Sequence, residues 1–342
     1  MSAEAEAAQE RDDAAQSAAG ERRTWLREAW TRSYRGENSA ILMAAMILTV
    51  IVFALLLRGT GYLSVENFVG IVRQTTVISV MAAVTVFVIS AGEIDLSIAA
   101  VIPVAGYTLA LMIPRYGPFL SVAAALACGA AIGLVNGLIT VRLRVPSFVV
   151  TLGMLGLLQG LARLPTNSQA VIVSHEAYTF VFGGGDLGPI PVLALWTLAT
   201  AVIGFVVLGW TKVGKAVLAT GANASAARFS GIRTGAVKIG VLVASGMAGA
   251  LAGLLYVGQY HGARFDLGST DLLTVIAAAI IGGTALAGGK GSVVGAVIGS
   301  LLLGTVNNGL IILGLDVPQQ LMFRGLIIIA AVVLSARAGR RT

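Results

Sequence analysis

Charged residues are scarce in this chain. Only 11% of its 342 residues are charged, whereas 57% are hydrophobic. Soluble domains carry about 25% charged residues, so this composition cannot cover a folded domain with a water-facing surface. The scarcity of charge excludes a soluble globular protein and indicates a polytopic membrane protein.

Cysteine and histidine are nearly absent, which limits the available chemistry. Cys128 is the single cysteine, so no internal disulfide can form, and its apolar surroundings predict a packing role. His175 and His261 are far apart and have no zinc-type spacing. We therefore expect no metal site.

The net charge of +7 does not by itself indicate nucleic-acid binding, because its placement follows the chain ends and loops. The first 39 residues hold six arginines and eight acidic residues, without a signal-peptide pattern. We predict a disordered cytosolic tail at 1–39 and a basic cytosolic C-terminus at 337–342.

Apolar runs fill the rest of the chain. A helical span needs about 20 apolar residues. Candidate spans lie at 40–57, 69–90, 96–113, 118–140, 147–163, 190–209, 237–258, 271–287, 292–315 and 319–336. The fold class predicted is an all-α polytopic membrane protein with about ten transmembrane helices, forming one transmembrane domain at 40–336.

Basic residues gather in alternate loops of this arrangement. With the N-terminus in the cytosol, the inside segments hold eleven basic residues against Glu93 and Asp95, while the outside set holds six of each sign. The inside basic residues are Arg142, Arg144, Lys212, Lys215, Arg228, Arg233, Lys238, Lys290, Arg337, Arg340 and Arg341. The positive-inside rule therefore predicts that both termini are cytosolic.

Glycine is abundant, with 43 residues, and many glycines sit at small-xxx-small spacing. The examples are Gly129/Gly133/Gly137, Gly156/Gly160, Gly249/Gly253 and Gly295/Gly299. Lipid supplies no hydrophobic drive between helices, so small residues that permit close backbone approach are expected to pack the bundle.

Two glycine-containing breaks interrupt apolar runs near the cytosolic side. One is "VISAGEIDLSIAAV", in which Asp95 or Ser97 is expected to cap the following helix. The other is "GGTALAGGKGSVVGAVIGS". Each is either a surface turn or a re-entrant break covered by protein. The predicted hinge or gate residues are Gly92, Glu93, Asp95, Gly288, Gly289, Lys290 and Gly291.

No catalytic residue or nucleotide site is predicted. A phosphate loop needs Ser or Thr directly after its lysine, but Gly291 follows Lys290. Glu93 and Asp95 are the inner-side acids that a self-sufficient proton-coupled carrier could use. Polar residues within the spans pack between helices or line a translocation pathway. The pathway candidates are Asn136, Gln159, Asn307 and Asn308.

A short polar stretch, "NASAARFSG", lies in a basic loop between two apolar spans. Asn223 suits an N-cap and Gly231 the C′ position, which leaves a helix of about two turns, roughly 10–12 Å long. A free helix this short is marginal in water. It must dock on its own protein, on lipid headgroups or on a cytosolic partner that supplies a motor.

Four motifs carry a family resemblance. "SAGEIDLSIAAV", "RVPSFVVTLGMLGLLQGLA", "GKAVLATGANASAARFSGI" and "DLLTVIAAAIIGGTALAGGKGSVVGAVIGSLLLGTVNNGLIILGL" resemble, in order and spacing, the permease subunits of ribose-type importers of the ATP-binding-cassette class. The resemblance covers about 40–336. It implies a multi-pass protein of the bacterial cytoplasmic (inner) membrane.

The resemblance also implies partners. They are a second permease chain, in a homodimer, two cytosolic ATPase subunits that bind ATP and Mg, and an extracytoplasmic solute-binding protein. The loop 210–236 would carry a coupling helix. Its residues would be Asn223, Ser225, Ala226, Ala227, Arg228, Ser230 and Gly231. Family members commonly have glutamate where this chain has Ser225.

The substrate implied is a monosaccharide, a pentose or similar hexose. Relatives within the same superfamily carry autoinducer-type sugars, nucleosides or branched-chain amino acids. A proton-coupled carrier using Glu93 and Asp95, and a membrane scaffold that transports nothing, are the rival hypotheses.

Overall fold

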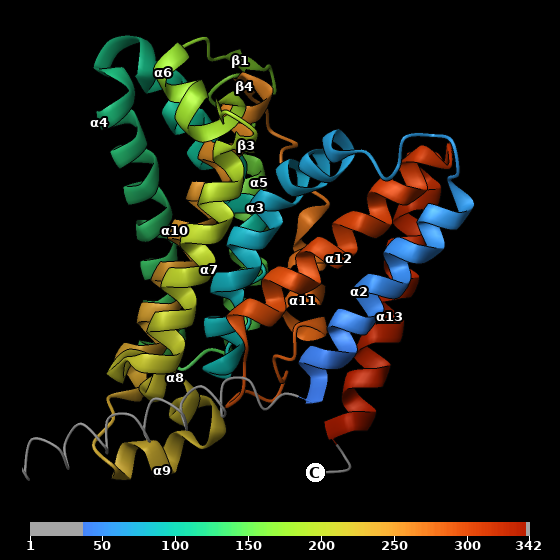
Figure 1. The fold of residues 1–342 in the computed structure, drawn as a ribbon. Helices are drawn as coiled ribbons and strands as arrows, with labels where there is room; N and C mark the ends of the chain where they lie inside the picture. The colour runs from blue at the N-terminus through green and yellow to red at the C-terminus, as the bar shows by residue number, and fades with distance from the viewer. Residues whose placement is uncertain (1–36, 340–342) are drawn as a thin grey trace, which may run out of the picture.

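The computed structural model describes residues 37–339 and is dominated by helices (Figure 1). The helices are α2 (Glu37–Leu56), α3 (Val65–Ser90), α4 (Ile98–Arg142), α5 (Ser147–Leu161), α6 (Glu176–Thr179), the π-helix η1 (Phe180–Gly184), α7 (Val192–Trp210), α8 (Lys212–Ala222), α9 (Ala224–Phe229), α10 (Thr234–Tyr260), α11 (Asp271–Ile281), α12 (Val293–Ile312) and α13 (Val317–Gly339).

Each predicted span coincides with a helix. Helix α4 accounts for two of them, because Gly117 interrupts it with φ 71° and ψ 173°. By length and composition, five helices among the described residues are long and apolar enough to cross a bilayer, namely α3, α4, α7, α10 and α12. Shorter apolar helical segments lie at Leu42–Leu56, in α5 and in α11. The ten crossings therefore stay a prediction.

Three predicted boundaries were wrong. Helix α2 begins at Glu37, so residues 37–39 are not a disordered tail, while residues 1–36 lie outside the described residues. Helix α13 continues to Gly339, so only 340–342 of the predicted C-terminal segment lie outside. The span expected at 271–287 ends at Ile281, because the chain turns at Gly283 with φ 94°.

Four two-residue strands qualify the all-α expectation. Strand β1 (Val171–Ile172) pairs antiparallel with β4 (Gly262–Ala263), and β2 (Asp186–Leu187) pairs antiparallel with β3 (Ile190–Pro191). They lie in loops joining the long helices, where backbone groups need partners that a helix would otherwise supply. They leave the helical architecture unchanged.

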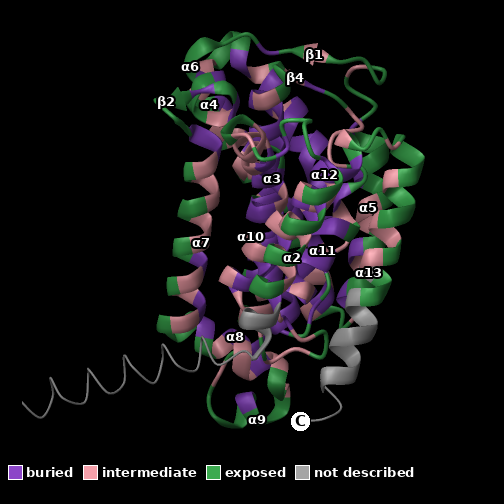
Figure 2. Cartoon of the chain, turned by 45° about the vertical axis from the view of Figure 1, so that its right-hand side comes forward, coloured by how far each residue is buried: buried purple, intermediate pink, exposed green. Residues whose placement is uncertain are grey.

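The core is centred on α3 and α10, which contribute many of its buried residues (Figure 2). Helix α10 packs closely on α4, as the small-residue spacing predicted. A Cβ on Gly133 would lie 2.8 Å from the Cα of Val243, and one on Gly249 would lie 2.9 Å from the Cβ of Val101. By contrast, a Cβ on Gly156 or Gly160 would meet nothing within 4 Å among the described residues, so that pair packs no helix here.

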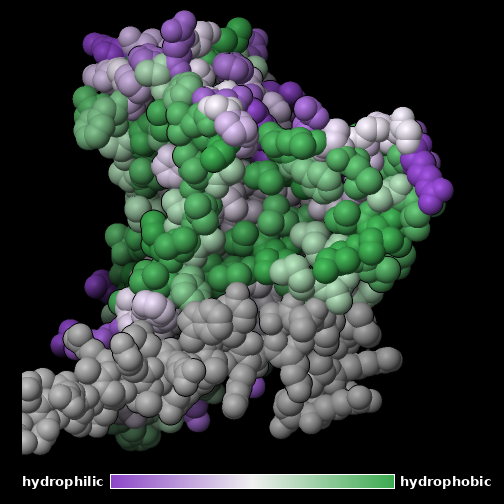
Figure 3. Space-filling model, viewed as in Figure 1, coloured by the Kyte–Doolittle hydropathy of each residue, from purple (hydrophilic) through white to green (hydrophobic). Residues whose placement is uncertain are grey.

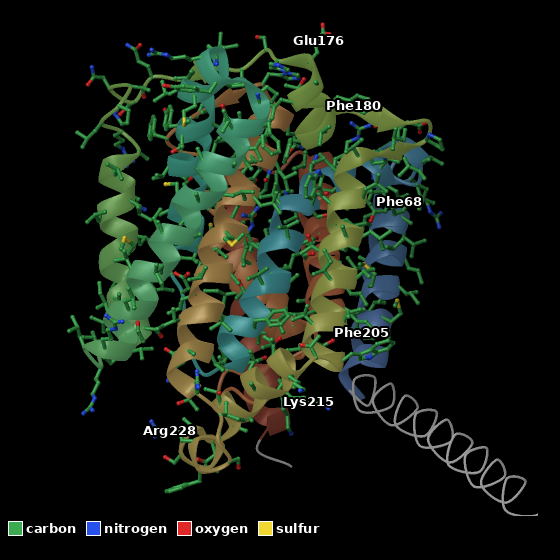
Figure 4. All side chains as sticks on the ribbon, turned by 90° about the vertical axis from the view of Figure 1, so that its left-hand side faces the viewer. Phe68, Glu176, Phe180, Phe205, Lys215 and Arg228 are labelled. Carbon is green, nitrogen blue, oxygen red and sulfur yellow. The ribbon has the colours of Figure 1, made fainter. Side chains whose placement is uncertain are left out.

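The surface has a broad apolar band, and hydrophilic residues gather at the upper end of the face seen in Figure 3. Lys215 and Arg228 lie at one end of the molecule and Glu176 at the other (Figure 4). The start of α2 and the end of α13 lie at the same end as α9 (Figure 1). This arrangement agrees with cytosolic termini, which remain a prediction.

Candidate functional site

Helix α9 has the ends that the sequence predicted. The Oδ1 of Asn223 accepts hydrogen bonds of 3.0 Å from the backbone N–H groups of Ser225 and Ala226. At the other end, Gly231 has φ +82°, and the N–H of Ile232 reaches back to the carbonyl of Ala227. These bonds satisfy groups that a six-residue helix leaves unpaired. The local sequence thus determines where this helix begins and ends.

Removal of the N-cap gives the first testable prediction. Asn223→Ala removes the acceptor for two backbone N–H groups, which costs about 0.5–2 kcal/mol of helix stability. We expect faster hydrogen exchange at the amides of Ser225 and Ala226. Asn223→Asp is the matched control, because aspartate is an equally good cap. Unchanged exchange in the alanine variant would contradict the role of Asn223.

Most side chains of α9 are exposed. Ala227 is buried against the protein, whereas Ser225, Ala226, Arg228 and Ser230 are exposed. Phe229, between Arg228 and Ser230, is 95% exposed. Arg228 donates a hydrogen bond of 3.3 Å to the Oγ of Ser225, which gives this serine a polar contact within the helix. The sequence prediction missed Phe229, although a lone aromatic in a polar loop was its signal.

The two predicted hinge breaks meet each other and the end of α8. The N–H of Gly289 donates to the carbonyl of Ser90 at 2.9 Å. A Cβ on Gly92 would lie 3.7 Å from the Cα of Gly221, and one on Gly288 would lie 2.9 Å from the Gly221 carbonyl oxygen. We call this meeting of Ser90, Gly92, Gly221, Gly288 and Gly289 the glycine junction.

The glycine junction connects the short helix to both breaks. Gly92, Gly288 and Gly289 all have φ between 77° and 85°, a region open chiefly to glycine. Without side chains between them, the three backbone segments touch directly. Only two residues separate Gly221 from α9, so the contacts of Gly221 place the start of α9 close to both breaks along the chain. The sequence prediction gave Gly221 no role, because only the folded chain shows the contact.

The acids of the first break are tied to neighbouring helices. Buried Glu93 forms an ion pair with Lys238 of α10. Asp95 accepts hydrogen bonds from the N–H and Oγ of Ser97 at 2.8 and 2.6 Å. Ser97 itself makes no side-chain capping bond, so of the two expected caps only Asp95 binds a backbone N–H here. The ion pair connects the break to α10, and the bonds of Asp95 connect it to the start of α4.

The backbone of the first break is satisfied by side chains of α5. The N–H of Ile94 donates to the Oγ of Ser147, and the N–H of Leu96 donates to the Oγ1 of Thr151, both at 3.1 Å. Irregular backbone inside a membrane protein requires such cover. Lys290 of the second break is exposed, and the side chain of Ser90 lies against Gly291.

The Glu93–Lys238 pair gives a second prediction. Lys238→Ala leaves the carboxylate of Glu93 buried without its partner, which we expect to lower stability by roughly 1–3 kcal/mol because Lys238 is partly exposed. A lower melting temperature of the detergent-solubilised chain would show it. The double variant Glu93→Gln/Lys238→Ala should recover part of the loss, since no unpaired charge remains. Equal melting of the single and double variants would contradict this account.

The predicted pathway residues do not share one surface. Asn136 in α4 is fully buried and donates to the Oγ of Ser97 at 2.9 Å. Gln159 in α5 is exposed. Asn308 exchanges amide hydrogen bonds with Asn67 of α3, while Asn307 accepts from Arg324 of α13 at 3.0 Å. Asn136 thus braces the first break, and a role of these residues in a pathway stays a prediction.

The family comparison and the similar proteins both identify transport permeases. A family model described as branched-chain amino acid transport system / permease component matches residues 67–332. The ribose import permease protein RbsC of Escherichia coli K12 is 34% identical over 315 residues, covering 90% of this chain and 96% of the relative. No solved structure matches the chain.

Two further relatives are similar over most of their length. The L-arabinose ABC transporter permease protein AraH of Azospirillum brasilense is 32% identical, covering 84% of this chain and 85% of the relative. The D-allose transport system permease protein AlsC of Escherichia coli K12 is 32% identical, covering 84% and 90%. Their names share a permease role and a sugar substrate.

Proposed function

Because the chain belongs to the branched-chain amino acid transport system / permease component family and is a sugar-importer permease of the ATP-binding-cassette class, we propose that it translocates a ribose-type monosaccharide across the bacterial inner membrane. The relatives named for ribose, L-arabinose and D-allose support a pentose or a similar hexose. The motor is a separate protein, and α9 is the helix that binds it.

One observation carries the motor assignment. Helix α9 is locally capped, protrudes at one end of the molecule and presents Phe229 without cover. A short helix with an exposed aromatic tip fits a cleft on a partner, where aromatic anchors contribute most of the binding energy. The exposed Arg228 next to it adds a positive charge for an acidic rim.

The assembly proposed has two copies of this chain, two cytosolic ATPase subunits and an extracytoplasmic binding protein that delivers the sugar. ATP and Mg are held by the ATPase subunits, and this chain supplies no ATPase site. The binding protein performs most of the substrate selection. This agrees with the separation of the pathway candidates, which do not form one polar surface.

The mechanism proposed is alternating access driven through the glycine junction. When the ATPase subunits close, α9 moves with them, and α8 follows because a single residue, Asn223, joins the two helices. Gly221 then shifts against Ser90 and Gly289, which changes the relative position of the breaks before α4 and α12. Two states differ in energy only through such differential contacts.

Uptake measurements test the proposal. The complex reconstituted in proteoliposomes should import labelled ribose, arabinose or allose when ATP is supplied on the α9 side, and a protonophore should leave the import unchanged. Asp95→Asn should retain ATP-driven import if the insertion of the chain is unchanged. A proton-coupled carrier predicts the opposite, with import abolished by the protonophore and by Asp95→Asn even in the presence of ATP.

A scaffold without transport activity predicts no uptake under any condition. Import of nucleosides or branched-chain amino acids in place of sugars would retain the motor assignment and overturn the substrate assignment. A panel containing all of these solutes therefore separates the two parts of the proposal.

A further inference from the structure

An apolar groove of about 650 Å³ runs along the outside of the helical core, and the translocation machinery described above does not use it. Its floor is α3, with Phe87 on it, its walls are α7 and α10, and α8 lines the end towards α9. Helix α7 packs on α3, α8 and α12 but makes almost no contact with α10, which leaves the space between them open. Its volume lies within the range of about 300–1,000 Å³ typical of ligand sites.

The groove is long and follows the helix axes. On α7 it is lined by Ile203 and Val207, one turn apart, and on α10 by Val237, Gly240 and Ala244. From Arg233 to Ala244 the lining covers twelve residues, and the eleven steps between them make about 16 Å at the rise of a helix. An apolar groove of this length, parallel to the membrane helices, is suited to a hydrocarbon chain.

Within the described part of the chain, two charged residues line the groove, and both are basic and lie at its α9 end. They are Lys212, the first residue of α8, and Arg233, which directly precedes α10. Both are exposed, and neither forms an ion pair with a carboxylate among the described residues. The groove thus combines an apolar body with a positively charged mouth at the end predicted to face the cytosol.

We propose that this groove binds one anionic phospholipid of the cytosolic leaflet, with an acyl chain between α7 and α10 and the phosphate held by Lys212 and Arg233. Basic pockets between transmembrane helices on the cytosolic side are suited to anionic headgroups. A sugar does not fit this lining, because Thr200 is its single uncharged polar side chain among the described residues and sugar hydroxyls need several hydrogen-bond partners.

The position of the two basic residues gives the lipid a role in coupling. Lys212 and Arg233 stand at the two ends of the segment that contains α8 and α9. A phosphate bound by both would fasten that segment to the bundle and stiffen the link between α9 and the glycine junction. This effect on transport rests on the proposed function, whereas the binding of lipid does not.

Native mass spectrometry of the full chain tests the binding. The probe is an equimolar mixture of phosphatidylglycerol and phosphatidylcholine with identical acyl chains. We expect the wild-type chain to retain phosphatidylglycerol about 30-fold in preference, as two basic residues near the headgroup predict. Lys212→Ala/Arg233→Ala should lose the preference. Arg142→Ala/Arg144→Ala is the matched control, because it removes the same charge from exposed residues outside the groove and should retain it.

A second variant fills the groove without removing charge. A Cβ on Gly240 would meet nothing within 4 Å, so Gly240→Phe places a ring in the groove without a clash at its Cβ. We expect this variant to retain neither lipid at the site, with an unchanged melting temperature. Retention of phosphatidylglycerol by both Gly240→Phe and Lys212→Ala/Arg233→Ala would overturn the proposal, as would a wild-type chain without preference.

Photo-cross-linking identifies the occupant. A benzophenone on Val213→Cys, an exposed lining residue next to Lys212 in the chain, in a Cys128→Ser background should form an adduct with phosphatidylglycerol in vesicles of the same mixture. An adduct with residues 1–36 or with a second copy of the chain would overturn the lipid assignment. Failure of sugar uptake with lipid binding intact would overturn the proposed function and leave the lipid site standing.

Discussion

Replacing Gly221 with alanine is expected to reduce sugar uptake about 100-fold per inserted chain, because an overpacking penalty of about 3 kcal/mol in one of two required states changes their populations by that factor. A Cβ at this position would overlap the carbonyl of Ser90 and lie 2.8 Å from the N of Gly289. Backbone atoms on both sides cannot rotate away as a side chain would. The added methyl group therefore forces α8 away from both breaks.

The matched control for this variant is Gly209→Ala. Gly209 lies in the last turn of α7, close to α8 in the sequence, and a Cβ there would meet nothing within 4 Å. It should retain wild-type uptake. The amount of each variant in the membrane is measured beside uptake, so that loss of insertion is separated from loss of transport. Wild-type uptake by an inserted Gly221→Ala chain would show that the glycine junction does not transmit movement from α8 to the two breaks.

Replacing Phe229 with alanine is expected to weaken the binding of the ATPase by about 30-fold or more, since truncating an anchor costs about 2 kcal/mol or more. The side chain is 95% exposed, so its removal takes nothing from the packing of this chain. We expect an unchanged melting temperature together with loss of the ATPase from the tagged permease during purification. The combination distinguishes a docking residue from a structural one.

Phe119→Ala is the control for the loss of an exposed aromatic. Phe119 is 85% exposed and lies two residues after Gly117, at the kink of α4. The kinked segment of α4 lies at the end of the molecule opposite to α9 (Figure 1). Its truncation should leave the ATPase bound. Equal co-purification of the ATPase with the Phe229→Ala and wild-type chains would contradict the docking role of α9.

The features predicted correctly from the sequence are those that depend on a few neighbouring residues. Asn223 and Gly231 terminate α9 through hydrogen bonds within the segment itself. The small residues at Gly133 and Gly249 predicted close helix packing, because only the spacing along one helix face matters there. The boundary at Ile281 failed because an apolar run continues past the glycines that end the helix.

The arrangement of the candidate site depends on contacts that no local pattern contains. The two breaks are separated by almost 200 residues, yet Gly289 donates to Ser90. Asn136 was a pathway candidate on polarity alone, whereas burial and the bond to Ser97 give it a bracing position. The local sequence also could not predict the ion pair of Glu93 with Lys238, because the first break and α10 are far apart in the chain. Tertiary packing decides all three.

The measurement that tests the central claim most directly is a cross-link from α9. A cysteine replaces Ala226, an exposed residue of this helix, in a Cys128→Ser background, so that it is the single thiol of the chain. The chain is expressed in its own cells and treated with a short thiol-to-amine reagent. Capture of a protein with ATPase motifs is the result that we predict. Capture of lipid or of the chain itself, with no ATPase in intact membranes, would contradict the assignment of α9 as the coupling helix.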